Sequence, residues 1–127
     1  KRWTHQGGIA SPLIASWPTG LLDTETIDHR VAHVIDILPT LVDVAGAPAD
    51  LTGLDGVSLL PSWRSRTEPD ADRTLCWEHI GNAAVLRGPW KLVREYGLAW
   101  ELYDIDRDRA ELHDLSADHP ELERDLP

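Results

Sequence analysis

The sequence predicts an α+β fold, with helical and loop segments first and a small antiparallel sheet of about four strands after them. Apolar residues recur at three- and four-residue spacing between residues 31 and 45, which predicts a helix. Four short runs between residues 74 and 104 have the composition and spacing of strands. The chain has 127 residues, of which 42% are hydrophobic and 27% charged, and these values are typical of a globular protein.

The first twenty residues predict loops and turns. Residues 1–8 mix polar and aromatic side chains and end in two glycines, which predicts a tight turn. Residues 9–17 are mostly apolar but contain a proline, which lacks a backbone donor, so we expect a buried, irregular strand there rather than a helix. The sequence Pro-Thr-Gly at residues 18–20 then predicts a turn.

The predicted helix spans about residues 36–45. Pro39 would interrupt a longer helix, whereas with Asp36 as the N-cap it falls in the first turn, where no backbone donor is needed. Gly46 supplies a left-handed stop, and residues 28–35 are expected to be extended or to form a short separate turn. We expect the apolar face to be buried; its members are Val31, Val34, Ile35, Leu38, Leu41, Val42 and Ala45.

The chain divides near residue 72 in this interpretation. Residues 47–72 contain several prolines and glycines, which predicts a long surface connection with a short helical turn at residues 59–63. Pro120 lies where a helix begins, so we expect a packed C-terminal helix that is cut short by the end of the chain. The predicted strands are residues 74–78, 83–86, 90–94 and 100–104, with a hairpin turn at residues 87–89.

The composition argues against several classes of protein. Against 12 Lys and Arg stand 22 Asp and Glu, a formal net charge of -10, whereas affinity for nucleic acid comes mainly from Lys and Arg. The longest uncharged run, residues 6–22, contains prolines and glycines and cannot be a membrane-spanning helix. The single cysteine, Cys76, excludes an internal disulfide and a zinc site of several thiolates. The chain has no methionine, so we expect it to be a piece of a longer protein.

Three groups of titratable residues have a favoured structural interpretation. Cys76 lies in a predicted strand, where a lone cysteine is usually a buried apolar filler. His29 and His33 have the spacing of two metal ligands on a helix, but no glutamate stands between them, so a surface or structural pair is favoured. Residues 104–114 are rich in aspartate, but the positions where a calcium loop needs Gly and Glu hold arginine and leucine, which favours a charged surface.

Three further residues are candidates for a functional site. His79, near Gly81 and Asn82 at the end of a predicted strand, could face a cleft and exchange protons near neutral pH. Lys1 stands six residues before the Gly-Gly turn, and a compact ammonium presented by a loop is a good ligand for sulfate or phosphate. His5 lies in the same segment and is a second candidate for binding substrate. A solvated surface role is the alternative for each of the three.

A series of short motifs covers nearly the whole chain in a fixed order. Residues 1–8 fit the pattern Lys-x-x-x-x-Glu-Gly-Gly, with Gln6 in place of the glutamate. This order of motifs resembles that of the sulfatases, the arylsulfatase-type members of the alkaline phosphatase superfamily. The other matching segments are residues 12–14, 17–18, 36–41, 45–47, 54–60, 77–79, 88–93 and 100–104.

The resemblance implies the C-terminal part of an α/β sulfatase fold, with residues 1–72 at the edge of the catalytic domain and residues 73–127 as a small subdomain. It also implies hydrolysis of sulfate esters by a formylglycine nucleophile assisted by calcium, with Lys1 contacting the sulfate oxygens. The Cys/Ser-x-Pro-x-Arg motif that yields formylglycine is absent, because Cys76 is followed by glutamate and isoleucine at the required positions, and the family's calcium ligands have no counterpart. We therefore expect the chain to be inactive alone and to need the N-terminal catalytic part of the same protein as its partner.

Two alternatives stay open. A phosphodiester or phosphonate monoester hydrolase of the same superfamily would share this C-terminal pattern. A non-catalytic binding or oligomerisation module is the other, because tryptophan is enriched at interfaces and the chain has six tryptophans, with two tyrosines and no phenylalanine. A role for the tryptophans in the core and at a domain interface is the favoured interpretation.

Overall fold

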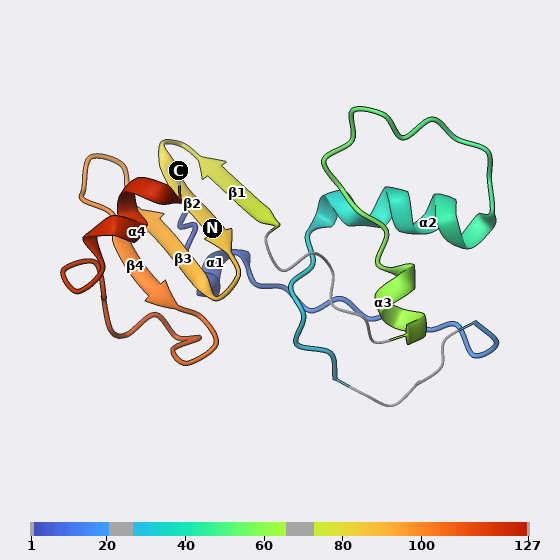
Figure 1. The fold of residues 1–127 in the computed structure, drawn as a ribbon, viewed down its shortest axis with the longest axis horizontal. Coiled ribbons are helices and arrows are strands. Elements are labelled where there is room, and N and C mark those ends of the chain that lie inside the picture. The colour runs from blue at the N-terminus through green and yellow to red at the C-terminus, as the bar shows by residue number, and fades with distance from the viewer. Residues whose placement is uncertain (1, 21–26, 66–72, 127) are drawn as a thin grey trace. The chain divides into compact units, whose positions relative to one another are not determined.

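A computed structural model describes residues 2–20, 27–65 and 73–126 of the chain (Figure 1). The described residues form two compact units. One consists of residues 2–13 together with residues 73–126, and the other consists of the described residues between 14 and 65. None of the described helices is long and apolar enough to cross a membrane.

The first unit is built on a four-stranded antiparallel sheet, as the sequence predicts. The strands follow one another in chain order, so that each pairs with the next. Gly88 adopts a left-handed conformation (φ 57°) in the predicted turn between the second and third strands. The strands are β1 (Thr74–His79), β2 (Asn82–Arg87), β3 (Trp90–Arg94) and β4 (Glu101–Asp104).

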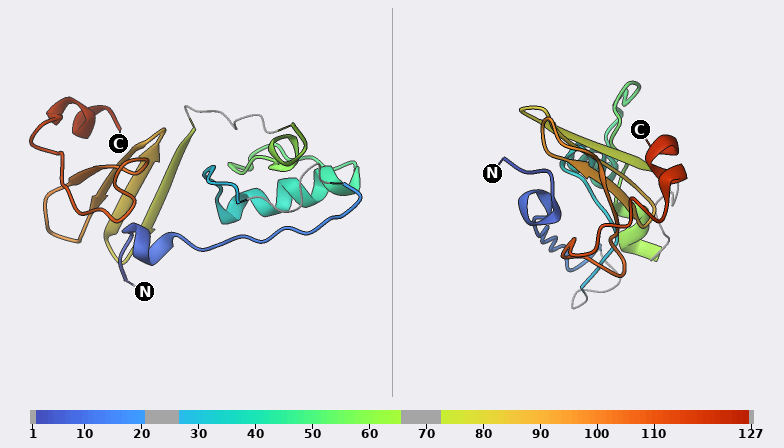
Figure 2. Two further views of the ribbon diagram at one scale, coloured as in Figure 1. Left: turned by 90° about the horizontal axis from the view of Figure 1, so that it is seen from below. Right: turned by 90° about the vertical axis from the view of Figure 1, so that its left-hand side faces the viewer.

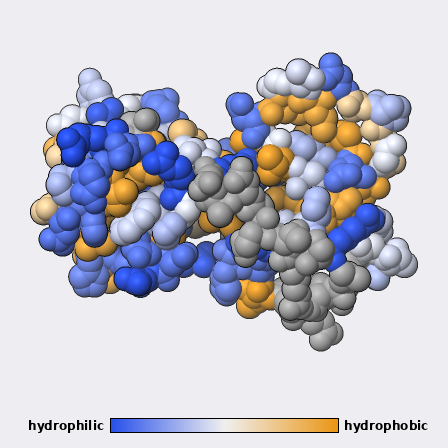
Figure 3. Space-filling model, viewed as in Figure 1, coloured by the Kyte–Doolittle hydropathy of each residue, from blue (hydrophilic) through white to orange (hydrophobic). Residues whose placement is uncertain are grey.

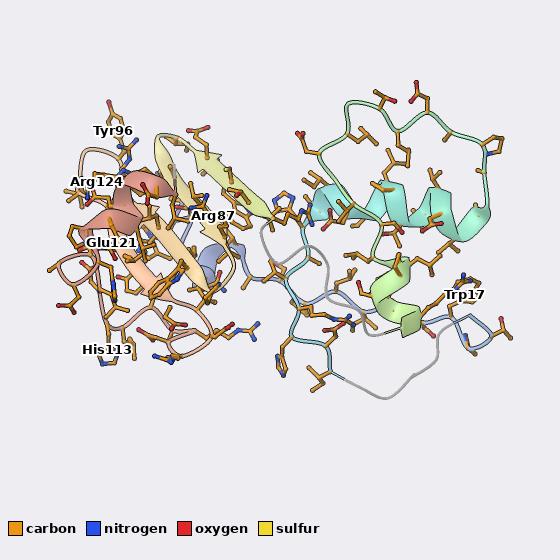
Figure 4. All side chains as sticks on the ribbon, in the orientation of Figure 1. Trp17, Arg87, Tyr96, His113, Glu121 and Arg124 are labelled. Atoms are coloured by element: carbon orange, nitrogen blue, oxygen red, sulfur yellow. The ribbon has the colours of Figure 1, made fainter. Side chains whose placement is uncertain are left out.

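Both faces of this sheet are covered, because successive side chains of a strand point to opposite faces. On one face the helix α4 (Pro120–Asp125) packs as predicted, and Arg87 donates a hydrogen bond to the backbone carbonyl of Asp125 at 2.8 Å (Figure 4). On the other face lies the short helix α1 (Gln6–Ile9) (Figure 2, right). The core against α4 is Val85, Leu92, Leu102 and Leu126, and the core of the other face is Ala84, Val93 and Tyr103.

The tryptophans of the sheet unit serve mainly in packing. Trp90 and Trp100 are half-buried against the core that α4 covers, and Trp77 is half-buried against the other core. The guanidinium of Arg94 lies 4.6 Å from the ring centroid of Trp100, a cation–π contact. These contacts agree with the interpretation that the tryptophans fill the core.

The second unit contains the helix that the sequence predicts. Helix α2 (Ile37–Ala45) begins after Asp36 and ends at Gly46, whose left-handed backbone (φ 59°) closes it. A single turn of 3₁₀ helix, η1 (Val34–Asp36), precedes it, in agreement with the predicted separate turn. Helix α3 (Leu60–Ser65) lies where the short helical turn was expected.

The predicted burial of the apolar face of α2 is wrong for this chain. Leu38 is 55% exposed and Leu41 59% exposed, and Val34 in the preceding turn is 71% exposed. The buried residues of this segment are Asp36, Pro39 and Thr40. Apolar residues therefore reach the surface of this unit (Figure 3). Helical periodicity identifies a face that avoids water, but here the described residues do not cover it.

The opening of the chain also departs from the prediction. Gly7 and Gly8 lie in a helical turn, α1, rather than in a loop, because the backbone N–H groups of residues 8 and 9 both bond to the carbonyl of His5. Residues 10–16 form no strand and are exposed, so the predicted buried strand is wrong. The turn at residues 18–20 is confirmed, and Trp17 beside it stacks on the guanidinium of Arg64 at 5.3 Å (Figure 4).

Replacing Asp36 with alanine is expected to destabilise the second unit by about 1–3 kcal/mol. Asp36 is fully buried, and its carboxylate accepts the backbone N–H groups of His33 at 2.8 Å and Val57 at 3.0 Å. Alanine would leave both donors without this acceptor, whereas asparagine keeps one carbonyl oxygen and should cost less. Thermal denaturation of the three proteins checks this order, and equal midpoints for alanine and wild type would contradict it.

Candidate functional site

The described chain is tied to the sheet from its first residue. The Nδ2 of Asn82 donates a hydrogen bond to the carbonyl oxygen of Arg2 at 2.7 Å. The Oδ1 of Asn82 accepts the backbone N–H of Tyr96 at 2.8 Å, and Asn82 is buried at the start of β2. Asn82 therefore uses both the nitrogen and the oxygen of its side-chain amide to hold the backbone of Arg2 and Tyr96 at the start of β2. Lys1 lies outside the described residues, so its role stays a prediction.

A buried lysine holds helix α1 on the sheet. The side chain of Lys91, the second residue of β3, is fully buried, and its Nζ lies 2.6 Å from Oε1 of Glu111 and 3.3 Å from Oε1 of Gln6. The second oxygen of Glu111 accepts the backbone N–H of Gln6 at 2.7 Å. Burial lowers the pKa of Lys91, and the carboxylate of Glu111 acts in the opposite direction. One carboxylate thus joins the sheet, α1 and the loop that follows β4.

The loop that follows β4 is held by its own aspartates. Asp108 Oδ2 accepts the backbone N–H groups of Leu112 and His113, both at 2.7 Å. Asp114 Oδ1 accepts the backbone N–H of Leu102 at 3.0 Å. Burial raises the pKa of Asp114, but its backbone hydrogen bonds outweigh that effect and hold the pKa below its usual value. The acidic residues therefore order the loop, which places Glu111 with a left-handed backbone (φ 56°) that a residue with a side chain rarely adopts.

His5 is the second predicted site residue, and it contacts a carboxylate of the sheet. Its Nε2 lies 3.1 Å from Oε2 of Glu101, and the same oxygen accepts the hydroxyl hydrogen of Tyr103 at 3.1 Å. Burial, and then the negative charge of Glu101, raise the pKa of Tyr103 far above its usual value, so its hydroxyl keeps its proton. His5 and Gln6 are thus held by two neighbouring carboxylates.

A surface hollow lies beside residues 2–9, which we call the opening segment. Trp3, which is 50% exposed, and His5 contribute its largest rings. The remaining lining residues are Arg2, Gly7, Gly8 and Glu95. The hollow therefore offers an aromatic surface together with groups of both charges, directly after the position of Lys1 in the chain.

Replacing Gly8 with alanine is expected to destabilise the opening segment by about 1–3 kcal/mol. A Cβ at Gly8 would lie 2.2 Å from the backbone carbonyl oxygen of Trp3, so the turn must open. Gly7 is the matched control, because a Cβ there meets nothing within 4 Å and alanine favours a helix by about 1 kcal/mol over glycine. Limited proteolysis within residues 2–9 should be faster in Gly8→Ala than in the wild type, whereas Gly7→Ala should be cleaved no faster than the wild type. Equal rates for the two variants would contradict the prediction.

The other sequence candidates lie elsewhere. His79 is exposed at the end of β1 and is not among the residues that line the hollow. Cys76 is exposed, so its predicted burial is wrong. His33 caps η1 by accepting the backbone N–H of Ile35, a structural role that agrees with the favoured interpretation of the His29–His33 pair. Among the described residues, no group of three or more His, Cys, Asp or Glu side chains could hold a metal.

Sequence reasoning missed the residues of the sheet and its loops that hold the opening segment, which are Lys91, Glu101, Glu111 and Asn82. One feature could have identified the first. A lysine between Trp90 and Leu92 interrupts an apolar run in a strand with both faces covered, and a charge there must find a partner. Nothing in the sequence marks Glu111 as that partner, because it lies 20 residues away in an acidic loop.

Comparison with known proteins shows the family. Residues 1–125 match the family described as N-sulphoglucosamine sulphohydrolase, C-terminal. An uncharacterized sulfatase of Schizosaccharomyces pombe is 29% identical over an alignment of 140 positions, which covers 99% of this chain and 25% of that protein. Human arylsulfatase A is 41% identical over 61 residues, which cover 48% of this chain and 12% of that protein. The chain thus spans about a quarter or less of the length of these relatives.

Solved structures share the fold. A 2-O GAG sulfatase superposes with a TM-score of 0.61 and 26% identity, over 83% of this chain and 25% of that one. The phosphonate monoester hydrolase of Agrobacterium radiobacter superposes with a TM-score of 0.52 and 27% identity, over 76% of this chain and 23% of that one. Together with the family match over residues 1–125, these structural similarities show that the chain belongs to the family of sulfatase C-terminal domains.

Proposed function

We propose that this chain is the C-terminal portion of an enzyme that hydrolyses sulfate esters, and that Lys1 contacts the sulfate and stabilises its charge in the transition state. The observation that carries the proposal is the anchoring of the segment after Lys1. Arg2 is held by Asn82, and Gln6 is held by Lys91 and Glu111. A charge contact is effective in catalysis when its position is fixed before the reaction, and a braced segment meets that requirement.

The catalytic nucleophile and the metal belong, in this proposal, to the N-terminal catalytic part of the protein. The calcium that the family implies does not fit the described residues. The aspartates of the loop after β4 already accept backbone N–H groups, as Asp108 and Asp114 show, and no cluster of ligands is present among the described residues. The sequence also lacks the formylglycine motif. The chain alone is therefore expected to be inactive.

The exposed apolar face of α2 supports a partner of this kind. Ile37, Leu38 and Leu41 are each at least 40% exposed on one short helix. Apolar surface gathered in this way is typical of a surface that another part of a protein covers. We propose that the N-terminal catalytic part packs there, with residues 1–72 at the edge of the catalytic domain and residues 73–127 as the subdomain.

The substrate of this proposal is a small molecule that carries a sulfate ester. His5 and His79 remain candidates for binding it. His5 lines the hollow beside the opening segment, while its Nε2 is engaged by Glu101. The exposed ring of Trp3 in the same hollow supports a substrate with a flat or ring-shaped group.

A phosphonate monoester or phosphodiester hydrolase is the second candidate, favoured by the likeness to the Agrobacterium radiobacter enzyme. An ammonium serves a tetrahedral oxyanion of sulfur or of phosphorus equally well. Assay of the full-length protein on an aryl sulfate, an aryl phosphonate monoester and an aryl phosphodiester separates the two. Turnover of the sulfate far above the others supports the proposal, and preference for either phosphorus ester overturns it. Hydrolysis of none would favour a non-catalytic binding or oligomerisation module.

A further inference from the structure

We infer that Glu111 is a positioning residue for the opening segment, and that the site requires one negative charge next to Lys91 rather than a glutamate at this particular position. The inference rests on the proposed function, because the segment that Glu111 positions directly follows Lys1, the residue assigned to the sulfate. Glu111 lies 110 positions along the chain from Lys1, on the loop that follows β4.

The geometry shows how one carboxylate controls the segment. Glu111 uses Oε1 for the ammonium of Lys91 and Oε2 for the backbone N–H of Gln6. That N–H belongs to the first turn of α1, whose donors have no partner within the helix. Glu111 therefore satisfies a helix terminus and neutralises a buried charge with the same group, and its left-handed backbone indicates that the loop is built to place it.

The charges explain why one carboxylate is enough. Lys91 is fully buried and carries one positive charge, which must be paired to be tolerated there. Gln6 offers the same ammonium a neutral oxygen at 3.3 Å, so three side chains share a single ion pair. Exchanging the acid and the amide keeps this balance. A glutamate at position 6 would accept from Lys91, and a glutamine at position 111 would accept the N–H of residue 6 through its carbonyl and donate to the new carboxylate.

The test uses the full-length protein and its sulfatase turnover. Glu111→Gln removes the only carboxylate from this group of three side chains, and kcat should fall about 10- to 100-fold through misplacement of the segment, with little change in KM. Gln6→Glu alone puts two carboxylates on one ammonium and should also lower kcat. The double variant Gln6→Glu/Glu111→Gln should recover most of the loss, and a double variant no better than Glu111→Gln overturns the inference.

Two controls separate positioning from general stability. Leu122→Ala weakens the packing of α4 on the opposite face of the sheet, so it should lower the melting temperature without lowering kcat at a temperature where the protein is folded. If Leu122→Ala lowers kcat as much as Glu111→Gln does, the effect is structural and the inference fails. Amide hydrogen exchange of residues 5–10 should be faster in Glu111→Gln and restored in the double variant, a readout that does not depend on activity.

A double-mutant cycle that combines Lys1→Ala with Glu111→Gln distinguishes failure of this inference from failure of the proposed function. If Glu111 acts through Lys1, the variant Lys1→Ala/Glu111→Gln should be no slower than Lys1→Ala alone. If the loss of turnover in the double variant equals the product of the losses in the two single variants, the inference is overturned and the proposed function stands. Wild-type turnover in Lys1→Ala overturns the proposed function, and with it the role of the segment that Glu111 positions.

Discussion

Replacing Lys1 with alanine in the full-length protein is expected to lower sulfatase turnover by about 100- to 1000-fold while the protein still folds. This is the typical effect of removing one preorganised charge contact from an active site. The segment after Lys1 is held by Asn82, Lys91 and Glu111, none of which the substitution changes. The loss should therefore appear in kcat rather than in stability, and steady-state kinetics with a melting curve checks both.

Two companion variants sharpen the result. Lys1→Arg keeps the positive charge but replaces a compact ammonium with a planar fork, so it should recover only part of the turnover. Arg107→Ala removes one positive charge from a side chain that is 88% exposed in the loop after β4, and it should leave turnover unchanged. Unchanged turnover in Lys1→Ala would remove Lys1 from the site, and an equal loss in Arg107→Ala would show a general effect of net charge.

The elements of the fold were predictable where local chemistry decides them. Gly46 ends α2 because its backbone must be left-handed, and Pro39 fixes the start of the helix because it lacks a donor. The four strands are short runs that alternate or are apolar, separated by turn residues, and they pair in chain order. In each case a few neighbouring residues contain the whole physical reason.

Burial was not predictable in the same way, because it depends on what covers a face. Leu38 and Leu41 share the face that periodicity identifies, yet both are more than half exposed. Cys76 lies in a predicted strand, but that strand is at the edge of the sheet and the side chain is exposed. The opening turn was predicted as a loop because a pair of glycines is typical of a tight turn, whereas the hydrogen bond from Gln6 to Glu111 stabilises the helical turn from 105 positions away.

The residues of the candidate site also differ in whether neighbouring residues or distant parts of the chain determine their contacts. His5 was a candidate because it lies in the opening motif, and the structure shows that it contacts Glu101, while its binding of substrate stays a prediction. Lys91 and Glu111 carry no motif of their own, and they become recognisable only when the fold brings the loop after β4 into contact with β3. Long-range ion pairs of this kind depend on three-dimensional proximity, which spacing in the sequence does not encode.

Replacing Lys91 with methionine is expected to destabilise the sheet unit by about 3–5 kcal/mol. Methionine fits an apolar strand, but it leaves the carboxylate of Glu111, which is 4% exposed, buried without its cation. Hydrogen exchange of the backbone amides in β3 and β4, measured in the full-length protein, reports the free energy of opening this sheet. The exchange should be faster by a factor that matches the loss of stability.

The double variant Lys91→Met/Glu111→Gln tests the cause of that loss. A buried ion pair replaced by neutral groups of similar size is often as stable as the original, because neither desolvation cost remains. Glutamine at position 111 can still accept the backbone N–H of Gln6, so the turn of α1 keeps its partner. The double variant should therefore be more stable than Lys91→Met alone. If it is less stable, the penalty lies in the packing of the lysine stem rather than in the abandoned charge, and the electrostatic account of this core is wrong.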